Sequence, residues 1–280
     1  MPDYRIGAYN IREYNVGILK QYADDYYKLV NLRSVRKAGY EDSSPSPVLP
    51  AARCAANNKK LSNNLSRARS AVYALARCNP WSYFVTLTLD PSKVDRNDLK
   101  AAYRKLAKWI NNYNSRHNCK VLYLLVPEPH KDGAWHFHGL LSGLPLDHLT
   151  AFSVHDHIPR HLKLLLQAGR QLYNWPAYAE SFGFVTVDAI RDIKRCSAYM
   201  TKYITKELLD SSIELNYHVY YCSKGLQRPE IIYRGQMQRP IEKPDFSNDY
   251  VTLKCFPSVE EALLYFCDLE VLQWKKLFCL

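Results

Sequence analysis

The sequence predicts an α+β fold in which a mainly antiparallel central sheet is flanked by helices. Alternating apolar, aromatic and β-branched residues over 82–90 and 182–188 are typical of strands, whereas the apolar spacing over 98–113 indicates a helix. The apolar segments 120–126 and 135–141 are separated only by a turn-rich connection, which favours an antiparallel hairpin. We expect the helices to pack against one face of this sheet.

The other elements follow from the same signals, in chain order. The segment 59–77 is predicted to be an amphipathic helix, with apolar residues on one stripe and arginines off it. After the hairpin we expect a helix, a short strand, a longer strand, a second helix and a strand or loop edge, over 160–171, 172–175, 182–188, 191–209 and 217–222.

The chain is predicted to consist of a central domain with an extension at each end. A Pro/Ser-rich stretch at 41–50 is typical of an exposed linker. We therefore divide the chain into a poorly defined N-terminal extension (1–56), a central domain (57–230) and a C-terminal extension (231–280).

Both extensions are expected to be helical. Loosely spaced tyrosine and aliphatic residues over 21–36 indicate a helix in the first extension. In the second extension, Ser258-Val-Glu-Glu261 has the form of a capping box and would open a last amphipathic helix that runs to about Phe278.

The composition favours a nucleic acid partner. The chain has 280 residues, of which 47% are apolar and 23% charged, an ordinary globular balance. Its formal net charge of +11 and its 22 tyrosines suit a polyanion whose bases can stack, as in single-stranded DNA. A merely basic protein is the alternative, so charge alone does not decide the function.

The cysteines and the N-terminus indicate the compartment. Eight cysteines are scattered without a Cys-x-x-Cys pair, which argues against a zinc ribbon and against a disulfide framework. No apolar signal core follows Met1, and no run of residues approaches membrane-spanning length. The simplest expectation is a cytoplasmic protein with reduced thiols and no membrane partner.

Trp135-His-Phe-His-Gly-Leu-Leu141 holds two histidines with one bulky residue between them. Because side chains alternate along a strand, His136 and His138 share one face, and their neutral imidazoles could bind one divalent metal ion. A His-x-His pair alone is a weak signal, since His155-Asp-His157 has the same spacing in a segment with no strand pattern.

Glu128 could supply a third metal ligand. It lies eight residues before His136, at the end of the paired strand, so a hairpin can bring its carboxylate beside the histidines. Two imidazoles and a carboxylate with open positions suit Mg²⁺ or Mn²⁺ that engages a phosphate oxygen, and the set could also hold Zn²⁺. His130 is an alternative third ligand.

Two tyrosines are candidate nucleophiles. Tyr199 and Tyr203 are four residues apart on a predicted helix and each is followed three residues later by a lysine, Lys202 and Lys206. A tyrosine hydroxyl beside a metal-bound phosphodiester can attack it, and a nearby cation would favour the phenolate and offset charge in the transition state. The alternative is that the tyrosines pack and the lysines are solvated.

Taken in order, three segments of the chain resemble the motifs of the HUH endonucleases, which initiate rolling-circle replication of plasmids and single-stranded DNA phages. Phe84-Val-Thr-Leu-Thr-Leu89 is similar to their first motif, and the histidine strand to their metal-binding motif. The segment from Tyr199 to Lys206 is similar to the third motif of two-tyrosine initiators. The resemblance covers roughly residues 70–230 and implies the ferredoxin-like Rep nuclease fold.

The resemblance implies a mechanism. Tyr199 would attack a phosphate of single-stranded origin DNA, leaving a 5′-phosphotyrosine and a free 3′-OH for a DNA polymerase, and Tyr203 could attack the regenerated origin. Thr86 and Thr88 would lie in a strand tied to DNA binding or site geometry, with packing as the alternative. The sequence lacks a phosphate-binding loop of a helicase, so host or separate helicase and polymerase are expected partners.

Two other functions remain open at this point. One is a transposase or mobilisation relaxase of the same superfamily, which would use the same chemistry on other DNA. The other is a non-catalytic basic DNA-binding protein whose histidines hold a structural metal, although a closed zinc site needs four ligands.

Overall fold

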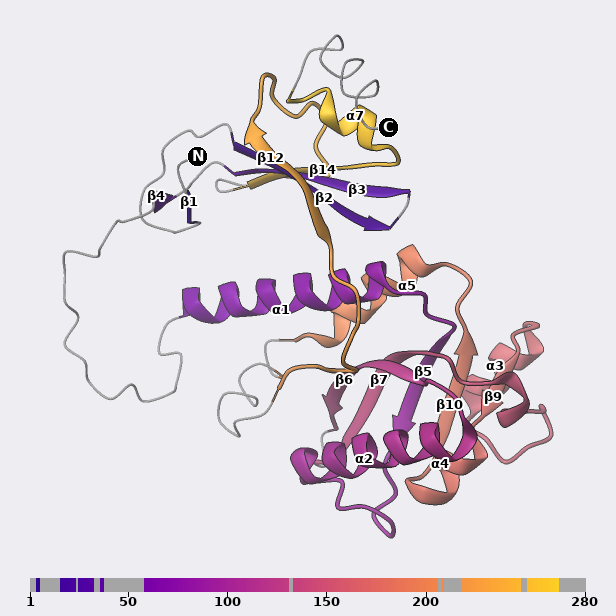
Figure 1. Cartoon of the computed structure of the whole chain (residues 1–280). Helices are drawn as coiled ribbons and strands as arrows, with labels where there is room; N and C mark the ends of the chain where they lie inside the picture. Colours follow the sequence, from indigo (N-terminus) through magenta and orange to yellow (C-terminus); the bar gives the residue numbers. More distant parts are fainter. Residues whose placement is uncertain are drawn as a thin grey trace, which may run out of the picture. The chain divides into compact units, whose positions relative to one another are not determined.

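The computed structural model describes residues 4–5, 16–23, 25–32, 36–37, 58–130, 133–205, 208, 218–247 and 251–266. The chain forms two compact units (Figure 1). The central unit comprises Ala51–Gln227, and the terminal unit comprises Met1–Pro50 together with Arg228–Leu280. The sequence-based division places the central domain at 57–230 and treats the two ends of the chain as separate extensions, whereas here the two ends belong to one unit.

The terminal unit is built on a five-stranded antiparallel sheet. Its strand order is β12-β2-β3-β14-β13. The bounds of these strands are β2 Val16–Ala23, β3 Tyr26–Leu32, β12 Glu230–Gln236, β13 Phe246–Ser247 and β14 Val251–Phe256. A two-residue ladder of β1 (Tyr4–Arg5) with β4 (Arg36–Lys37) and the short helix α7 (Val259–Leu263) complete its described elements.

The helix predicted over 21–36 is wrong, and so is the helical N-terminal extension. Residues there form the β2–β3 hairpin, in which Leu19 pairs with Leu29 and both side chains are fully buried. Apolar residues in this segment also satisfy a two-residue period, and burial against strands from the far end of the chain decides between the two patterns.

The predicted C-terminal helix begins where expected but its length is untested. Helix α7 starts after Ser258, whose hydroxyl donates to the carboxylate of Glu260 at 2.7 Å. The stretch 267–278, over which the helix was predicted to continue, lies outside the described residues.

The central unit is built on a seven-stranded antiparallel sheet in the order β11-β6-β7-β5-β10-β9-β8. Its strands are β5 Tyr83–Thr88, β6 Leu122–Pro129, β7 Trp135–Ser142, β8 Thr150–Ala151, β9 Leu172–Asn174, β10 Val185–Ala189 and β11 Tyr221–Cys222. The predicted hairpin is confirmed as β6–β7. The α+β class and the antiparallel sheet are therefore as the sequence predicts.

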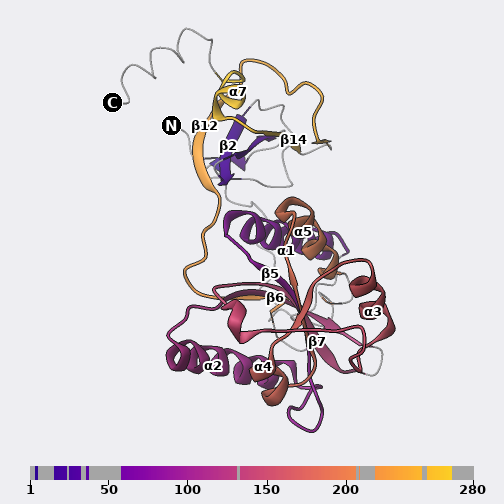
Figure 2. The same cartoon turned by 90° about the vertical axis from the view of Figure 1, so that its right-hand side faces the viewer.

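Helices cover both faces of this sheet, not one as predicted. Their bounds are α1 Asn58–Cys78, α2 Leu99–His117, α3 Arg160–Gln167, α4 Pro176–Ser181 and α5 Ile193–Met200, with 3-10 turns η1 Leu146–His148 and η2 Thr201–Tyr203. In both views α1 and α5 lie over one face and α2 and α4 over the other (Figures 1 and 2). Since nearly every side chain of β7 is buried, both of its faces need a covering layer.

A local cap and a long-range aromatic contact position helix α2. Its start is fixed by Asp98, whose carboxylate accepts a hydrogen bond from the backbone N–H of Ala101 at 2.9 Å. Farther along the helix, the ring of Trp109 packs against Trp175 and Phe182, with centroids 5.1 and 5.4 Å away.

Within the described residues, no helix has the length and hydropathy needed to cross a membrane.

Gly139 lets strand β7 approach strand β6 closely. A Cβ atom at this position would lie 2.6 Å from the backbone oxygen of Leu124 and 2.4 Å from a side-chain atom of Leu125. We expect Gly139→Ala to lower the free energy of unfolding by about 1–3 kcal/mol, because a strand backbone cannot move aside. Urea denaturation of the full chain measures this. Ser142→Ala, at the end of the same strand, is the control, and equal stability of the two variants would contradict the account.

Candidate active site

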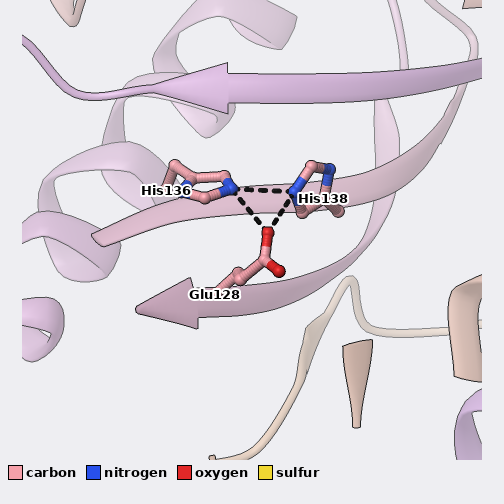
Figure 3. A group of neighbouring side chains, drawn as sticks. All are labelled: Glu128, His136 and His138. Atoms are coloured by element: carbon pink, nitrogen blue, oxygen red, sulfur yellow. Dashed lines mark hydrogen bonds and ion pairs between the residues drawn. The ribbon is translucent and has the colours of Figure 1, made fainter. Parts of the chain in front are cut away.

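Three atoms that could bind a metal ion converge on one face of the central sheet. Glu128 lies near the end of β6 and is the cross-strand partner of His136 on β7, while His138 is two residues further along β7. The Nε2 atom of His136 lies 2.8 Å from Oε2 of Glu128 and 2.8 Å from Nε2 of His138. The third side of this triangle, from His138 Nε2 to Glu128 Oε2, is 2.7 Å (Figure 3).

The ionisation of the three groups fits a divalent cation. Burial lowers the pKa of His136, and burial together with the neighbouring His136 lowers the pKa of His138 to about 4. Burial raises the pKa of Glu128, but the two imidazoles outweigh it and the net shift is downward. At neutral pH the group therefore offers two neutral imidazoles and one carboxylate, which could hold a metal ion.

Thr86 supports the orientation of one ligand. Thr86 lies on β5, the strand next to β7. Its hydroxyl oxygen lies 3.2 Å from Nδ1 of His138. When Nε2 faces a metal ion, Nδ1 carries the proton and donates to this hydroxyl, which fixes the ring. Thr88 is the cross-strand partner of His136. DNA binding by the two threonines stays a prediction.

The alternative ligands are placed differently. The ring of His130 packs against the ring of His136 with centroids 4.2 Å apart, while the ligand group found among the described residues consists of Glu128, His136 and His138. The second His-x-His pair, His155 and His157, is exposed in the loop before α3. Within the described residues, the expected set of three is the one assembled.

The two tyrosines occupy different environments. Helix α5 ends at Met200 and the 3-10 turn η2 follows, so Tyr199 is 45% exposed whereas Tyr203 is 7% exposed. The ring of Tyr203 stacks on His138 at 3.9 Å with an interplanar angle of 13°. Its hydroxyl donates to the hydroxyl of Tyr199 at 2.9 Å. Burial raises the pKa of Tyr203, so this phenol stays protonated.

The predicted lysines are only partly described. Lys202 lies with its ammonium 5.5 Å from the centroid of the Tyr199 ring, which places a cation beside the exposed phenol. Lys206 lies outside the described residues.

Two supporting residues were not identified as functional from the sequence. Phe84 on β5 contacts the ring of Tyr199 edge-on at 5.6 Å and lies parallel to His138 at 6.1 Å. Its place two residues before Thr86 on the same face was the available signal. Arg69 of α1 donates from Nε to the backbone oxygen of Ile204 at 3.0 Å and so holds the end of η2. No local signal reveals this contact.

Comparison with known proteins bears on this site. Residues 82–208 match the family described as replication-associated protein ORF2/G2P. The match includes the cluster of Glu128, His136 and His138 and both tyrosines. Neither the curated proteins nor the solved structures contain a match to this chain. The family match supports a replication initiator.

Proposed function

We propose that this protein initiates rolling-circle replication by nicking and rejoining single-stranded origin DNA. The observation that supports this most directly is a chain of contacts from a candidate metal ligand to the candidate nucleophile: Tyr203 stacks on His138, and its hydroxyl donates a hydrogen bond to the hydroxyl of the partly exposed Tyr199. An exposed phenol is thereby held beside a group that can bind a metal ion, on a chain with a formal net charge of +11. The proposed fold is that of the HUH endonucleases.

The chemistry assigns each group a role. Mg²⁺ or Mn²⁺ held by Glu128, His136 and His138 would supply charge stabilisation for the scissile phosphate. The hydroxyl of Tyr199 gives up its proton to solvent, and its oxygen forms a bond to phosphorus as the bond between phosphorus and the 3′ oxygen breaks. That oxygen leaves with the electron pair and takes up a proton, so the products are a 5′-phosphotyrosine and a free 3′-OH. Attack of a 3′-OH on the phosphotyrosine reverses the reaction and rejoins the strand.

The two tyrosines are proposed to differ in role. Tyr199 is the nucleophile, because this residue is 45% exposed and Lys202 lies beside its ring. Tyr203 orients the hydroxyl of Tyr199, because its own hydroxyl donates a hydrogen bond to it. Lys206 is proposed to add a second cation.

We expect Tyr203→Phe to slow the first cleavage about tenfold and to leave the covalent adduct on Tyr199, because the ring still stacks and only one hydrogen bond is lost. Single-turnover cleavage of labelled DNA measures this. If the variant cleaves at the normal rate but fails to transfer the strand to a second origin, Tyr203 is a second nucleophile.

The origin can be found with the chain itself. Single-stranded fragments of the DNA that carries the gene are incubated with the protein and Mn²⁺, and the strands that remain attached after denaturation are sequenced. We expect one recurrent sequence at the 5′ ends, and no capture in EDTA. Strands from terminal repeats would instead indicate transposition. Tight binding without covalent capture would favour a non-catalytic DNA-binding protein.

The proposed setting follows from this activity. A free 3′-OH at a nick is a primer, so a DNA polymerase must extend it in the cytoplasm of a bacterial host cell. A helicase from the host or from a separate gene would displace the nicked strand.

A further inference from the structure

We infer that Phe184, stacked on Phe152, binds a base of the single-stranded DNA next to the scissile phosphate. This inference rests on the proposed function. Phe184 is 38% exposed, although the side chains of Phe182 and Val185 beside it are fully buried. Its ring lies parallel to that of Phe152, with centroids 5.9 Å apart and an interplanar angle of 29°. The pair therefore presents aromatic surface to solvent.

The strand register places this pair in line with the metal ligands. Glu128 on β6 is opposite His136 on β7, and His136 is opposite Thr88 on β5. The backbone N–H of Thr88 then donates to the backbone oxygen of Phe184 at 2.9 Å. Glu128, His136, Thr88 and Phe184 therefore form one row of neighbouring residues across the sheet. The row begins at the carboxylate on β6 and ends at Phe184, just before β10.

The side chain of Phe184 belongs to the same face of the sheet as the ligands. Val185 pairs with Leu87, which pairs with Phe137 on the face opposite to the histidines. Phe184 precedes Val185, and successive side chains alternate, so Phe184 falls on the histidine face. Two strand spacings separate it from His136, about 10 Å between backbones. A base attached at or next to a phosphate held by the ligands can span this distance.

Gly183 fixes the position of Phe184. Its φ of +137° lies in a region that favours glycine, and a Cβ atom there would lie 2.8 Å from the backbone nitrogen of Asp90 and 2.9 Å from the oxygen of Thr88. The glycine lets the chain pass from buried Phe182 to exposed Phe184 while it stays bonded to the end of β5. The aromatic surface is therefore held by backbone contacts.

A nucleobase is the ligand that this surface suits. Every base has a flat π face, and stacking on an aromatic side chain does not depend on sequence. The formal net charge of +11 also favours a partner with negative charge, which single-stranded DNA carries.

Two measurements test the subsite. The first is the affinity for a fluorescein-labelled oligothymidylate in EDTA, by fluorescence anisotropy, which does not require cleavage. The second is cleavage of the captured origin strand with a single abasic position moved along it. The variants are Phe184→Ala and Phe184→Trp. The control is Leu164→Ala on α3, which also removes an exposed apolar side chain, since Leu164 is 56% exposed.

We expect Phe184→Ala to weaken oligothymidylate binding about tenfold, with Phe184→Trp and Leu164→Ala close to the unchanged protein. For the unchanged protein, one abasic position beside the nick should slow cleavage relative to the intact strand. For Phe184→Ala, the abasic and intact strands should be cleaved at the same rate. Equal affinity and an unchanged abasic profile in Phe184→Ala would overturn the subsite while cleavage itself stands. Absence of any covalent capture by the unchanged protein would instead overturn the proposed function, and the binding assay would still decide the subsite.

Discussion

Tyr199→Phe is expected to abolish the covalent protein–DNA adduct while single-stranded DNA still binds. The substitution removes only the hydroxyl that attacks phosphorus, and the ring contacts with Phe84 and Tyr203 remain possible. Loss of a covalent nucleophile lowers turnover by at least about 10³-fold in well-studied enzymes. Single-turnover cleavage of the captured origin strand on a denaturing gel measures the rate, and anisotropy measures binding.

Tyr203→Phe is the matched control for this prediction. It removes the neighbouring hydroxyl, and we expect its adduct to persist. If Tyr199→Phe cleaved at the normal rate, the assignment of the nucleophile would be wrong. If its adduct moved to Tyr203, both tyrosines would be nucleophiles.

The second large effect is expected from His136→Ala. This change removes one of three converging ligand atoms and leaves a carboxylate and a single imidazole. Removing a group that merely supports a ligand commonly weakens metal binding 10- to 100-fold, so losing a ligand should cost more than about 100-fold. Isothermal titration with Mn²⁺ measures the affinity, and cleavage should be undetectable even in excess Mn²⁺.

The chain contains its own control for the metal site. His155 lies in an exposed His-x-His pair with the same spacing as the proposed ligands. His155→Ala should bind Mn²⁺ and cleave DNA like the unchanged protein. Equal Mn²⁺ affinity of His136→Ala and the unchanged protein would refute the ligand set.

The grouping of Glu128, His136 and His138 could be predicted because its geometry is local. His136 and His138 share a face by strand alternation, and a hairpin is enough to bring Glu128 opposite His136. Thr86 could be placed on that face but not assigned, because its hydrogen bond to His138 depends on which strand lies beside β7. A strand can be recognised from its own residues, but the strand that pairs with it cannot.

The terminal sheet could not be predicted for the same reason. Leu19 pairs with Tyr233 on one side, and Leu29 pairs with Lys254 on the other side of the hairpin. The periodicity within 21–36 does not reveal pairing partners so far along the chain. Considered without those partner strands, the same apolar residues also fit a helix. Long-range pairing therefore overrode a weak helical pattern.

The difference between the two tyrosines also lay beyond the sequence. Four-residue spacing places Tyr199 and Tyr203 on one side of a helix, which makes them look equivalent. Their burial differs because the helix gives way to a 3-10 turn after Met200 and the second ring packs on His138. Packing against His138 on strand β7, and not the periodicity of the helix, therefore gives the two tyrosines different environments.

The most direct test of the central claim is to map the residue that becomes attached to DNA. The protein is incubated with the captured origin strand and Mn²⁺, digested with a protease, and the nucleotide-bearing peptide is identified by mass spectrometry. We predict a phosphodiester on Tyr199 that is absent in EDTA. A chain that binds this strand but carries no adduct, or an adduct that forms equally well in EDTA, would contradict this prediction.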